Sequence, residues 1–159
     1  MEAFKRVLGE EHPSTLASMA NLASTYRNQG RWKEAESLGL QVMETFKRVL
    51  GEEHPDTLTS MANLALTYTN QGRWKEAEAV EVQVMETRKR VLGEEHPDTL
   101  TSMANLAFTW KSQGRLSDAL ELMQNCLYLR RQVLGSDHPH TVSTLSLVTD
   151  WLDKKDNGD

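Results

Sequence analysis

The sequence is poor in cysteine, proline and aromatic residues, and each shortage narrows what the protein can be. Of its 159 residues, one is cysteine, four are proline and 6% are aromatic. The single cysteine, Cys126, cannot form a disulfide within the chain, so we expect a reducing compartment, the cytoplasm. Apolar residues make up 38% of the chain, which suits a modest core.

Long apolar runs and an excess of positive charge are absent as well. No stretch approaches the roughly 18–20 apolar residues that a membrane-spanning helix needs, and the start Met-Glu-Ala-Phe-Lys lacks the pattern of a signal peptide. The chain has 18 Lys and Arg against 23 Asp and Glu, a net charge of −5. This balance leaves no basic footprint for nucleic acid. We therefore expect neither a membrane nor a nucleic acid as partner.

Proline and glycine recur with a period of 42 residues. Every proline follows a histidine, at Pro13, Pro55, Pro97 and Pro139. Seven of the nine glycines fall into two series with the same spacing: Gly9, Gly51, Gly93 and Gly135, and Gly30, Gly72 and Gly114. Helix breakers at fixed phases of one period indicate an internal repeat.

This period predicts a single array of repeats over residues 1–159. Repeat 1 covers residues 8–49, repeat 2 residues 50–91 and repeat 3 residues 92–133, and repeats 1 and 2 agree at 33 of 42 positions. Residues 1–7 correspond to the end of a second helix, because residues 4–8 repeat residues 46–50 without a change. Residues 134–154 correspond to a terminal first helix and residues 155–159 to a tail. We therefore expect the array to be part of a longer one.

Each repeat carries two helical patterns. In repeat 2 the first pattern is one apolar stripe at steps of three, three, one and three: Leu58, Met61, Leu64, Ala65 and Tyr68. Pro55 suits the first turn of that helix, and Gly72 ends it as a left-handed cap. The second helix is predicted from about Trp74 to Leu92, where Gly93 stops it. Such a helix pair cannot bury its own faces and must stack on copies of itself.

These residues resemble a tetratricopeptide repeat (TPR). The run Met61-x-x-Leu64-Ala65-x-x-Tyr68-x-x-x-Gly72-x-Trp74-x-x-Ala77 matches the spacing of that family. The motif Leu-Gly-Glu-Glu-His-Pro-Asp-Thr is similar to the 42-residue variant of kinesin light chains. Near-identical copies also resemble the repeat arrays of fungal NOD-like (STAND-type) receptors. The resemblance implies an all-α, right-handed solenoid of antiparallel helix pairs that acts as a protein–protein interaction scaffold.

Residues that carry chemistry are too scattered for an enzyme. Histidines in stacked repeats would lie roughly 10 Å apart, whereas zinc holds its ligands near 2 Å, so we expect turn histidines and no metal. No nucleophile–base group, phosphate-binding loop or HExxH motif is present. Cys126 falls on the apolar phase of its helix and is expected to be a buried, inert thiol. We expect no enzyme and no cofactor.

The resemblance implies a concave groove lined by the first helix of each repeat, which would bind an extended peptide or a short helix. The residues assigned to ligand binding are Asn21, Asn63, Asn105, Thr59, Thr101, Leu66, Phe108, Arg27, Lys111 and Asn70. A row of asparagine amides can donate to and accept from a peptide backbone, and the alternative is that these amides are solvated or cap a helix. Leu66 and Phe108 would add apolar contact.

The alternative function is a structural spacer or a self-associating solenoid without a dedicated peptide ligand. In the terminal helix we predict an inward stripe at helical spacing: Val142, Leu145, Val148 and Leu152. Leu147 and Trp151 would then lie on an outer face and support weak self-association. The competing interpretation is that this helix is a solvated cap.

Overall fold

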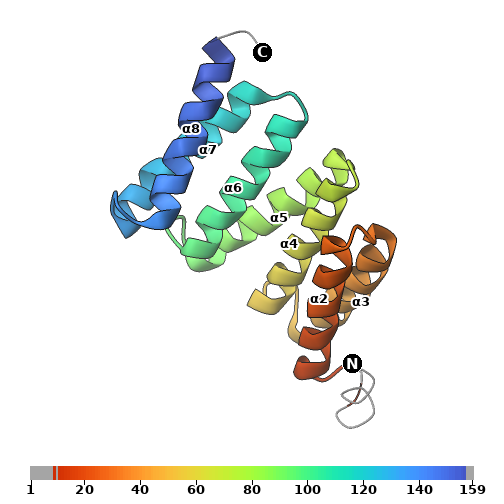
Figure 1. The fold of residues 1–159 in the computed structure, drawn as a ribbon. Helices are drawn as coiled ribbons and strands as arrows, with labels where there is room; N and C mark the ends of the chain where they lie inside the picture. The colour runs from red at the N-terminus through yellow and green to blue at the C-terminus, as the bar shows by residue number, and fades with distance from the viewer. Residues whose placement is uncertain (1–8, 10, 157–159) are drawn as a thin grey trace. The chain divides into compact units, whose positions relative to one another are not determined.

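The computed structural model describes residue 9 and residues 11–156. Within these residues every regular element is an α-helix, as predicted. The described helices are α2 (Pro13–Asn28), α3 (Trp32–Leu50), α4 (Pro55–Asn70), α5 (Trp74–Leu92), α6 (Pro97–Ser112), α7 (Leu116–Leu134) and α8 (Pro139–Asp156) (Figure 1). The helix end predicted at residues 1–7 lies outside the described residues. Helix α8 continues to Asp156, where the tail was expected from residue 155.

The first helix of each repeat begins with a histidine–proline cap. His12, His54 and His96 have extended backbone conformation just before a proline in the first turn. Each Nδ1 accepts a hydrogen bond from the backbone N–H two residues later, at 3.1–3.2 Å. Such a bond satisfies one of the N–H groups that a helix start leaves without a partner. The interpretation of these residues as turn histidines is confirmed.

Removing this cap should weaken the fold measurably. We expect His54→Ala to lower the free energy of unfolding by about 0.5–2 kcal/mol, because the Asp56 N–H loses its acceptor. His54→Asn is the matched control, since asparagine supplies a capping oxygen and should retain most of the stability. Urea unfolding followed by circular dichroism measures both variants. An equal loss in the two variants would contradict a capping role.

The glycines end the helices where the sequence predicted. Helix α4 ends at Asn70, and Gly72 follows with φ +74°, in the region that only glycine adopts readily. Helix α5 has the predicted bounds, Trp74–Leu92, and Gly93 after it has φ +97°. Local backbone chemistry is therefore sufficient to place these helix boundaries.

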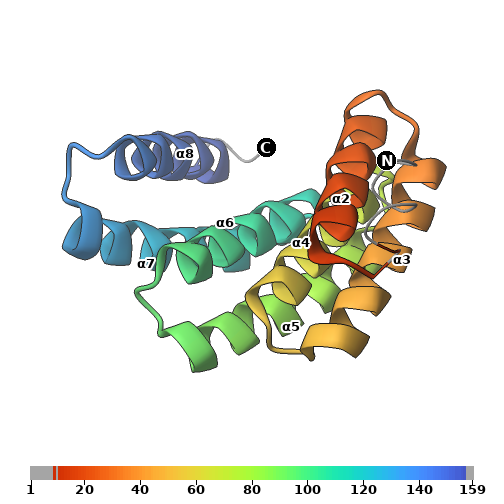
Figure 2. The same ribbon diagram turned by 90° about the horizontal axis from the view of Figure 1, so that it is seen from below.

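The described residues divide into two compact units, one up to Val80 and one from Glu81. In the first unit, α2 and α3 form an antiparallel pair, and α4 packs against α3 (Figures 1 and 2). Its core is a cluster of four buried side chains: Leu16 and Met19 of α2 with Val42 and Phe46 of α3. Ala65 and Ala77, the small residues of the predicted helix pair, are both fully buried.

The second unit repeats this arrangement with α6, α7 and α8. One cluster joins Leu100 and Met103 of α6 to Cys126 and Leu129 of α7. The other cluster also includes α8, which lies along α6 and α7 (Figure 2). Its buried members are Ala107, Ala119, Leu120, Met123, Leu127, Val148 and Trp151. The last helix is thus part of the core of this unit.

The orientation predicted for α8 is wrong. Trp151, placed on an outer face from the sequence, is 2% exposed, and Leu147 packs against the same cluster as a half-buried side chain. Of the stripe expected inward, Val148 is buried, whereas Val142, Leu145 and Leu152 are 51%, 41% and 36% exposed.

The physical reason for this difference lies in the helices that α8 contacts. Its buried face consists of Thr141, Thr144, Val148 and Trp151, at steps of three, four and three. Two of these residues are threonines, which an apolar pattern does not select. Thr144 Oγ1 donates to the His140 carbonyl oxygen at 2.7 Å within the helix, so its burial carries little penalty.

Candidate peptide-binding groove

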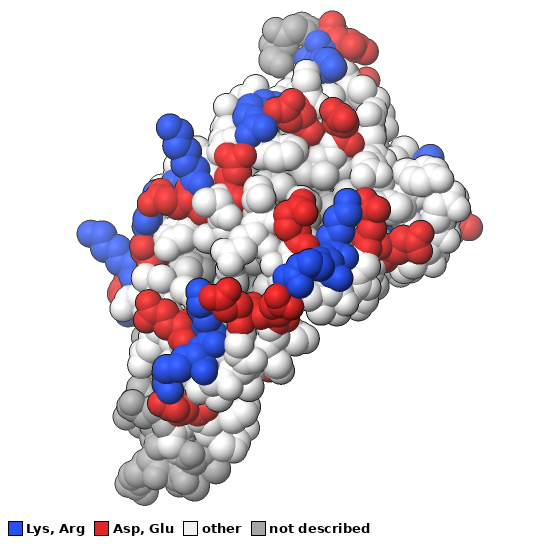
Figure 3. All heavy atoms as spheres, turned by 180° about the vertical axis from the view of Figure 1, so that it is seen from behind, with Lys and Arg blue, Asp and Glu red and all other residues white. Residues whose placement is uncertain are grey.

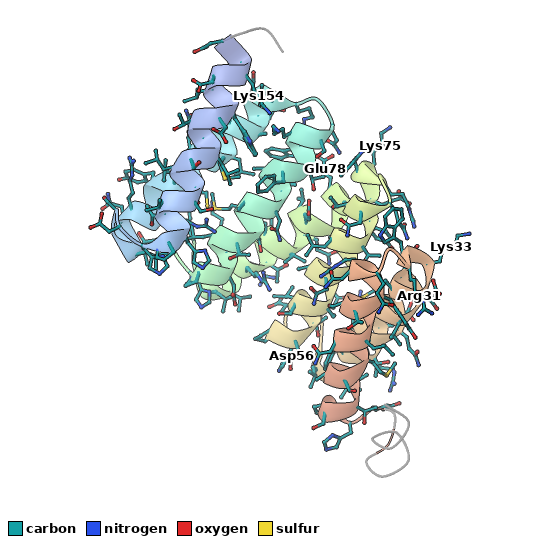
Figure 4. The ribbon with its side chains drawn as sticks, in the orientation of Figure 1. Arg31, Lys33, Asp56, Lys75, Glu78 and Lys154 are labelled. Carbon is teal, nitrogen blue, oxygen red and sulfur yellow. The ribbon has the colours of Figure 1, made fainter. Side chains whose placement is uncertain are left out.

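An open pocket of about 430 Å³ lies between α2 and α4 in the first unit. Its lining residues are Pro13, Ser14, Ala17, Ala20, Asn21, Phe46, Asp56, Thr59, Ser60 and Asn63. Asp56 lies at the start of α4 (Figure 4). The structure therefore brings together Asn21, Asn63 and Thr59, three of the residues assigned to ligand binding.

The asparagine amides are the distinctive groups of this pocket, which we call the α2–α4 groove. Asn21 is exposed and Asn63 is half-buried. Their backbone carbonyls accept hydrogen bonds from Thr25 and Thr67 at 2.9 and 3.1 Å. Their side-chain amides have no hydrogen-bond partner among the described residues. Both lie in the middle of a helix, so neither is a cap, and both amides are available to a ligand.

A positive charge lies at one side of the groove. A small hollow of about 20 Å³ shares Ala20, Ser60 and Asn63 with it and is also lined by Arg27. The half-buried Arg27 donates from Nη1 to the Asn63 carbonyl oxygen at 3.3 Å. Burial lowers the pKa of this guanidinium, and no carboxylate pairs with it among the described residues. The arrangement offers a cation to an acidic ligand group.

The other predicted binding residues do not line this groove. Leu66 is half-buried on α4, and Asn70 is exposed at the end of the same helix. In the second unit, Asn105 is half-buried, and exposed Thr101 donates from Oγ1 to the Pro97 carbonyl oxygen at 2.9 Å.

Phe108 and Lys111 already have an intramolecular partner. The Phe108 ring meets the Trp151 ring edge to face, with centroids 5.3 Å apart. The Lys111 Nζ lies 5.2 Å from the centroid of the same indole. Helix α8 therefore engages these two side chains, which were predicted to contact a ligand.

Sequence reasoning missed an arginine motif at the turn between the two helices of each repeat. Each arginine stacks its guanidinium on the aromatic ring near the end of the first helix and bonds an acidic residue three positions later. The sets are Arg31 with Tyr26 and Glu34, Arg73 with Tyr68 and Glu76, and Arg115 with Trp110 and Asp118. The recurring Gly-Arg pair followed by Glu or Asp was the available signal.

In the first unit this motif also ties α3 to the end of α4. Arg73 Nη1 contacts Glu36 Oε1 at 2.7 Å, and Gln71 Nε2 donates to Glu36 Oε2 at 2.9 Å. Burial opposes ionisation of Glu36, but the hydrogen bonds from Gln71 and Arg73 hold its pKa below the ordinary value. Arg31 lies at the equivalent turn, at the start of α3 (Figure 4). Figure 3 shows the resulting surface, on which basic and acidic side chains are interleaved.

Groups that would support catalysis or metal binding are not assembled in the described part of the chain. No three His, Cys, Asp or Glu side chains there are grouped to hold a metal ion. The buried Cys126 donates from Sγ to the Leu100 carbonyl oxygen at 3.3 Å, and burial raises the pKa of its thiol. None of the described helices combines the length and apolar composition needed to cross a membrane.

Comparisons with known proteins agree with this architecture. Models of the tetratricopeptide repeat match residues 1–48, 15–89 and 99–140. A search of curated proteins found no match. The resemblance to fungal NOD-like receptor arrays is not tested by these matches and stays a prediction.

Solved structures extend the likeness to almost the whole chain. Two crystal structures, one of them of a single-residue variant, come from a Podosopora anserina protein described as a putative kinesin light chain with nearly identical TPR-like repeats. They are 31% identical to this chain, with TM-scores of 0.81 and 0.80, and cover 99% of it and 73% and 74% of their own length. BtubC (BKLC) from P. vanneervenii shares the fold at 21% identity and a TM-score of 0.74, covering 87% of this chain and 57% of its own. The chain belongs to the tetratricopeptide-repeat family, and its repeats are of the kinesin-light-chain type.

Proposed function

We propose that this protein is a scaffold that binds an extended peptide in the α2–α4 groove. TPR proteins in general mediate protein–protein interactions, and the chain belongs to that family. The observation that carries the proposal is the pair of asparagine amides, Asn21 and Asn63, which line one pocket from two helices without an intramolecular partner among the described residues.

The chemistry of the groove favours an extended peptide over a short helix. Each amide has both a donor and an acceptor and can pair with the N–H and C=O groups of a peptide backbone. Those groups are free in an extended segment but already bonded in a helix. Ala17, Ala20 and Phe46 provide apolar surface in the same pocket. Arg27, at its side, favours a peptide that carries an acidic residue.

This function needs no catalytic group and no cofactor. Binding would use preformed surface on two helices held by the Leu16 and Phe46 cluster. We place the protein in the cytoplasm, because its one cysteine is free and buried and the chain has no disulfide to protect it outside the cell.

Binding selected peptides tests the groove directly. A random-peptide library displayed on phage is selected against the full chain, and the affinity of the selected peptides is measured by fluorescence anisotropy. We expect the Asn21→Ala, Asn63→Ala double variant to bind at least about tenfold more weakly, equivalent to about 1.4 kcal/mol. Circular dichroism should not change, since neither amide bonds another described part of the fold.

Asn125→Ala is the matched control, because Asn125 is an exposed asparagine on α7. This variant should bind the selected peptides as the unsubstituted chain does. Equal affinity of the double variant and the unsubstituted chain would contradict the groove proposal. If no peptide can be selected, the result would favour the alternative function, a structural spacer or self-associating solenoid.

A further inference from the structure

Helix α8 exposes two apolar side chains at positions that every earlier described first helix buries. Val142 is 51% exposed and Leu145 is 41% exposed. At the same places in the 42-residue period, the preceding helices carry side chains that are 7% exposed or less. These are Leu16 and Met19 in α2, Leu58 and Met61 in α4, and Leu100 and Met103 in α6.

The two units show what covers these positions in a complete repeat. In the first unit, Val42 and Phe46 of α3 pack on Leu16 and Met19. In the second unit, the corresponding half of α7 packs on Leu100 and Met103. In both cases the cover is the second helix of the same repeat, and no described helix follows α8 to provide it.

The chain carries a further copy of a covering segment at its own start. Residues 4–8 are identical to residues 46–50, the last five residues of α3, and Met1-Glu2 repeats Met43-Glu44. Phe4 therefore occupies the place in the period that Phe46 occupies in repeat 1. Residues 1–8 lie outside the described part of the structure, so this step rests on their sequence.

Charge complementarity points to the same pairing. In repeat 1, the Arg48 guanidinium contacts the Glu11 carboxylate at 2.6 Å, joining the end of the second helix to the loop before the first. Arg6 lies one period before Arg48, and Asp137 lies three periods after Glu11. The exposed Asp137, in the loop before α8, has no partner among the described residues.

We propose that two copies of this chain associate head to tail, with residues 1–8 of one copy covering Val142 and Leu145 of the other. Phe4 packs on the two exposed side chains, and Arg6 pairs with Asp137 of the second copy. The contact is heterologous, so it does not close on itself and further copies can add. It uses neither asparagine of the α2–α4 groove and leaves that groove open.

Sedimentation equilibrium of the full chain over a concentration series tests this association. We expect the weight-average mass to rise with concentration. The tail variant Val142→Gln, Leu145→Gln and the head variant Phe4→Ser should each associate at least about tenfold more weakly. A mixture of the two should form dimers, because one intact head meets one intact tail, but no larger species. Tyr128→Gln, at a 61% exposed position on α7, is the control and should associate like the unsubstituted chain.

A charge exchange separates this contact from a general loss of structure. Asp137→Arg and Arg6→Asp should each weaken association, and the chain that carries both should recover it. A chain that stays monomeric at every concentration would overturn the proposal. A head variant that associates like the unsubstituted chain would overturn it as well, because α8 would then bind some other face. Failure of the double charge variant to recover would remove the Arg6–Asp137 pair.

Discussion

Replacing Trp151 with alanine should lower the free energy of unfolding by about 3–5 kcal/mol, the usual cost of removing a large buried aromatic side chain. Trp151 is 2% exposed and belongs to the cluster that joins α6, α7 and α8. The substitution would also remove the edge-to-face contact with Phe108 and the contact of the Lys111 ammonium with the indole. The loss is expected to be greatest in α8, because a terminal helix has neighbours on one side only.

The neighbouring residue Leu152 provides a matched control for this variant. Leu152 is 36% exposed, so Leu152→Ala should cost less than about 1 kcal/mol, near the range of surface substitutions. Urea unfolding gives the free energies, and hydrogen exchange of the α8 amides shows whether the loss is local. A stable Trp151→Ala variant with weakened self-association would instead place the indole on an outer face.

Replacing Leu106 with alanine should cost about 2–5 kcal/mol. Its side chain is 0% exposed, and the substitution leaves a cavity that helices packed on several sides cannot fill by relaxing. The expected destabilisation combines the transfer free energy of the deleted methyl groups with the dispersion attraction that the atoms lining the void no longer have. Urea unfolding of the full chain measures it.

Leu22 is the same residue in the same local sequence, and it supplies the comparison. Both leucines lie between an asparagine and an alanine in the first helix of a repeat, but Leu22 in α2 is half-buried. Leu22→Ala should therefore cost less than Leu106→Ala, because less apolar area returns to water. Equal losses would show that repeat sequence, and not burial, sets the contribution of this position.

The repeat boundaries, the helix ends and the family follow from the sequence by itself. Pro55 and Gly72 act through the backbone of their own neighbours, so their effect on helix start and end does not depend on the rest of the fold. The 42-residue period then carries this local information to every repeat. The histidine caps were predicted only as turn residues, since the Nδ1 acceptor is visible only in the structure.

Tertiary structure alone decided which face of α8 is buried and which groove residues are available to a ligand. Helix α8 has two apolar stripes, one through Val142 and Leu145 and one through Leu147 and Trp151, and hydrophobicity does not rank them. The packing partners do: α6 and α7 accept Trp151, whereas Val142 and Leu145 face the side where a further second helix would lie. In the same way, Phe108 is engaged by α8, while Asn21 and Asn63 line an open pocket. Burial and free amides depend on segments far apart in the sequence, and a repeat pattern does not record where the array of neighbours stops.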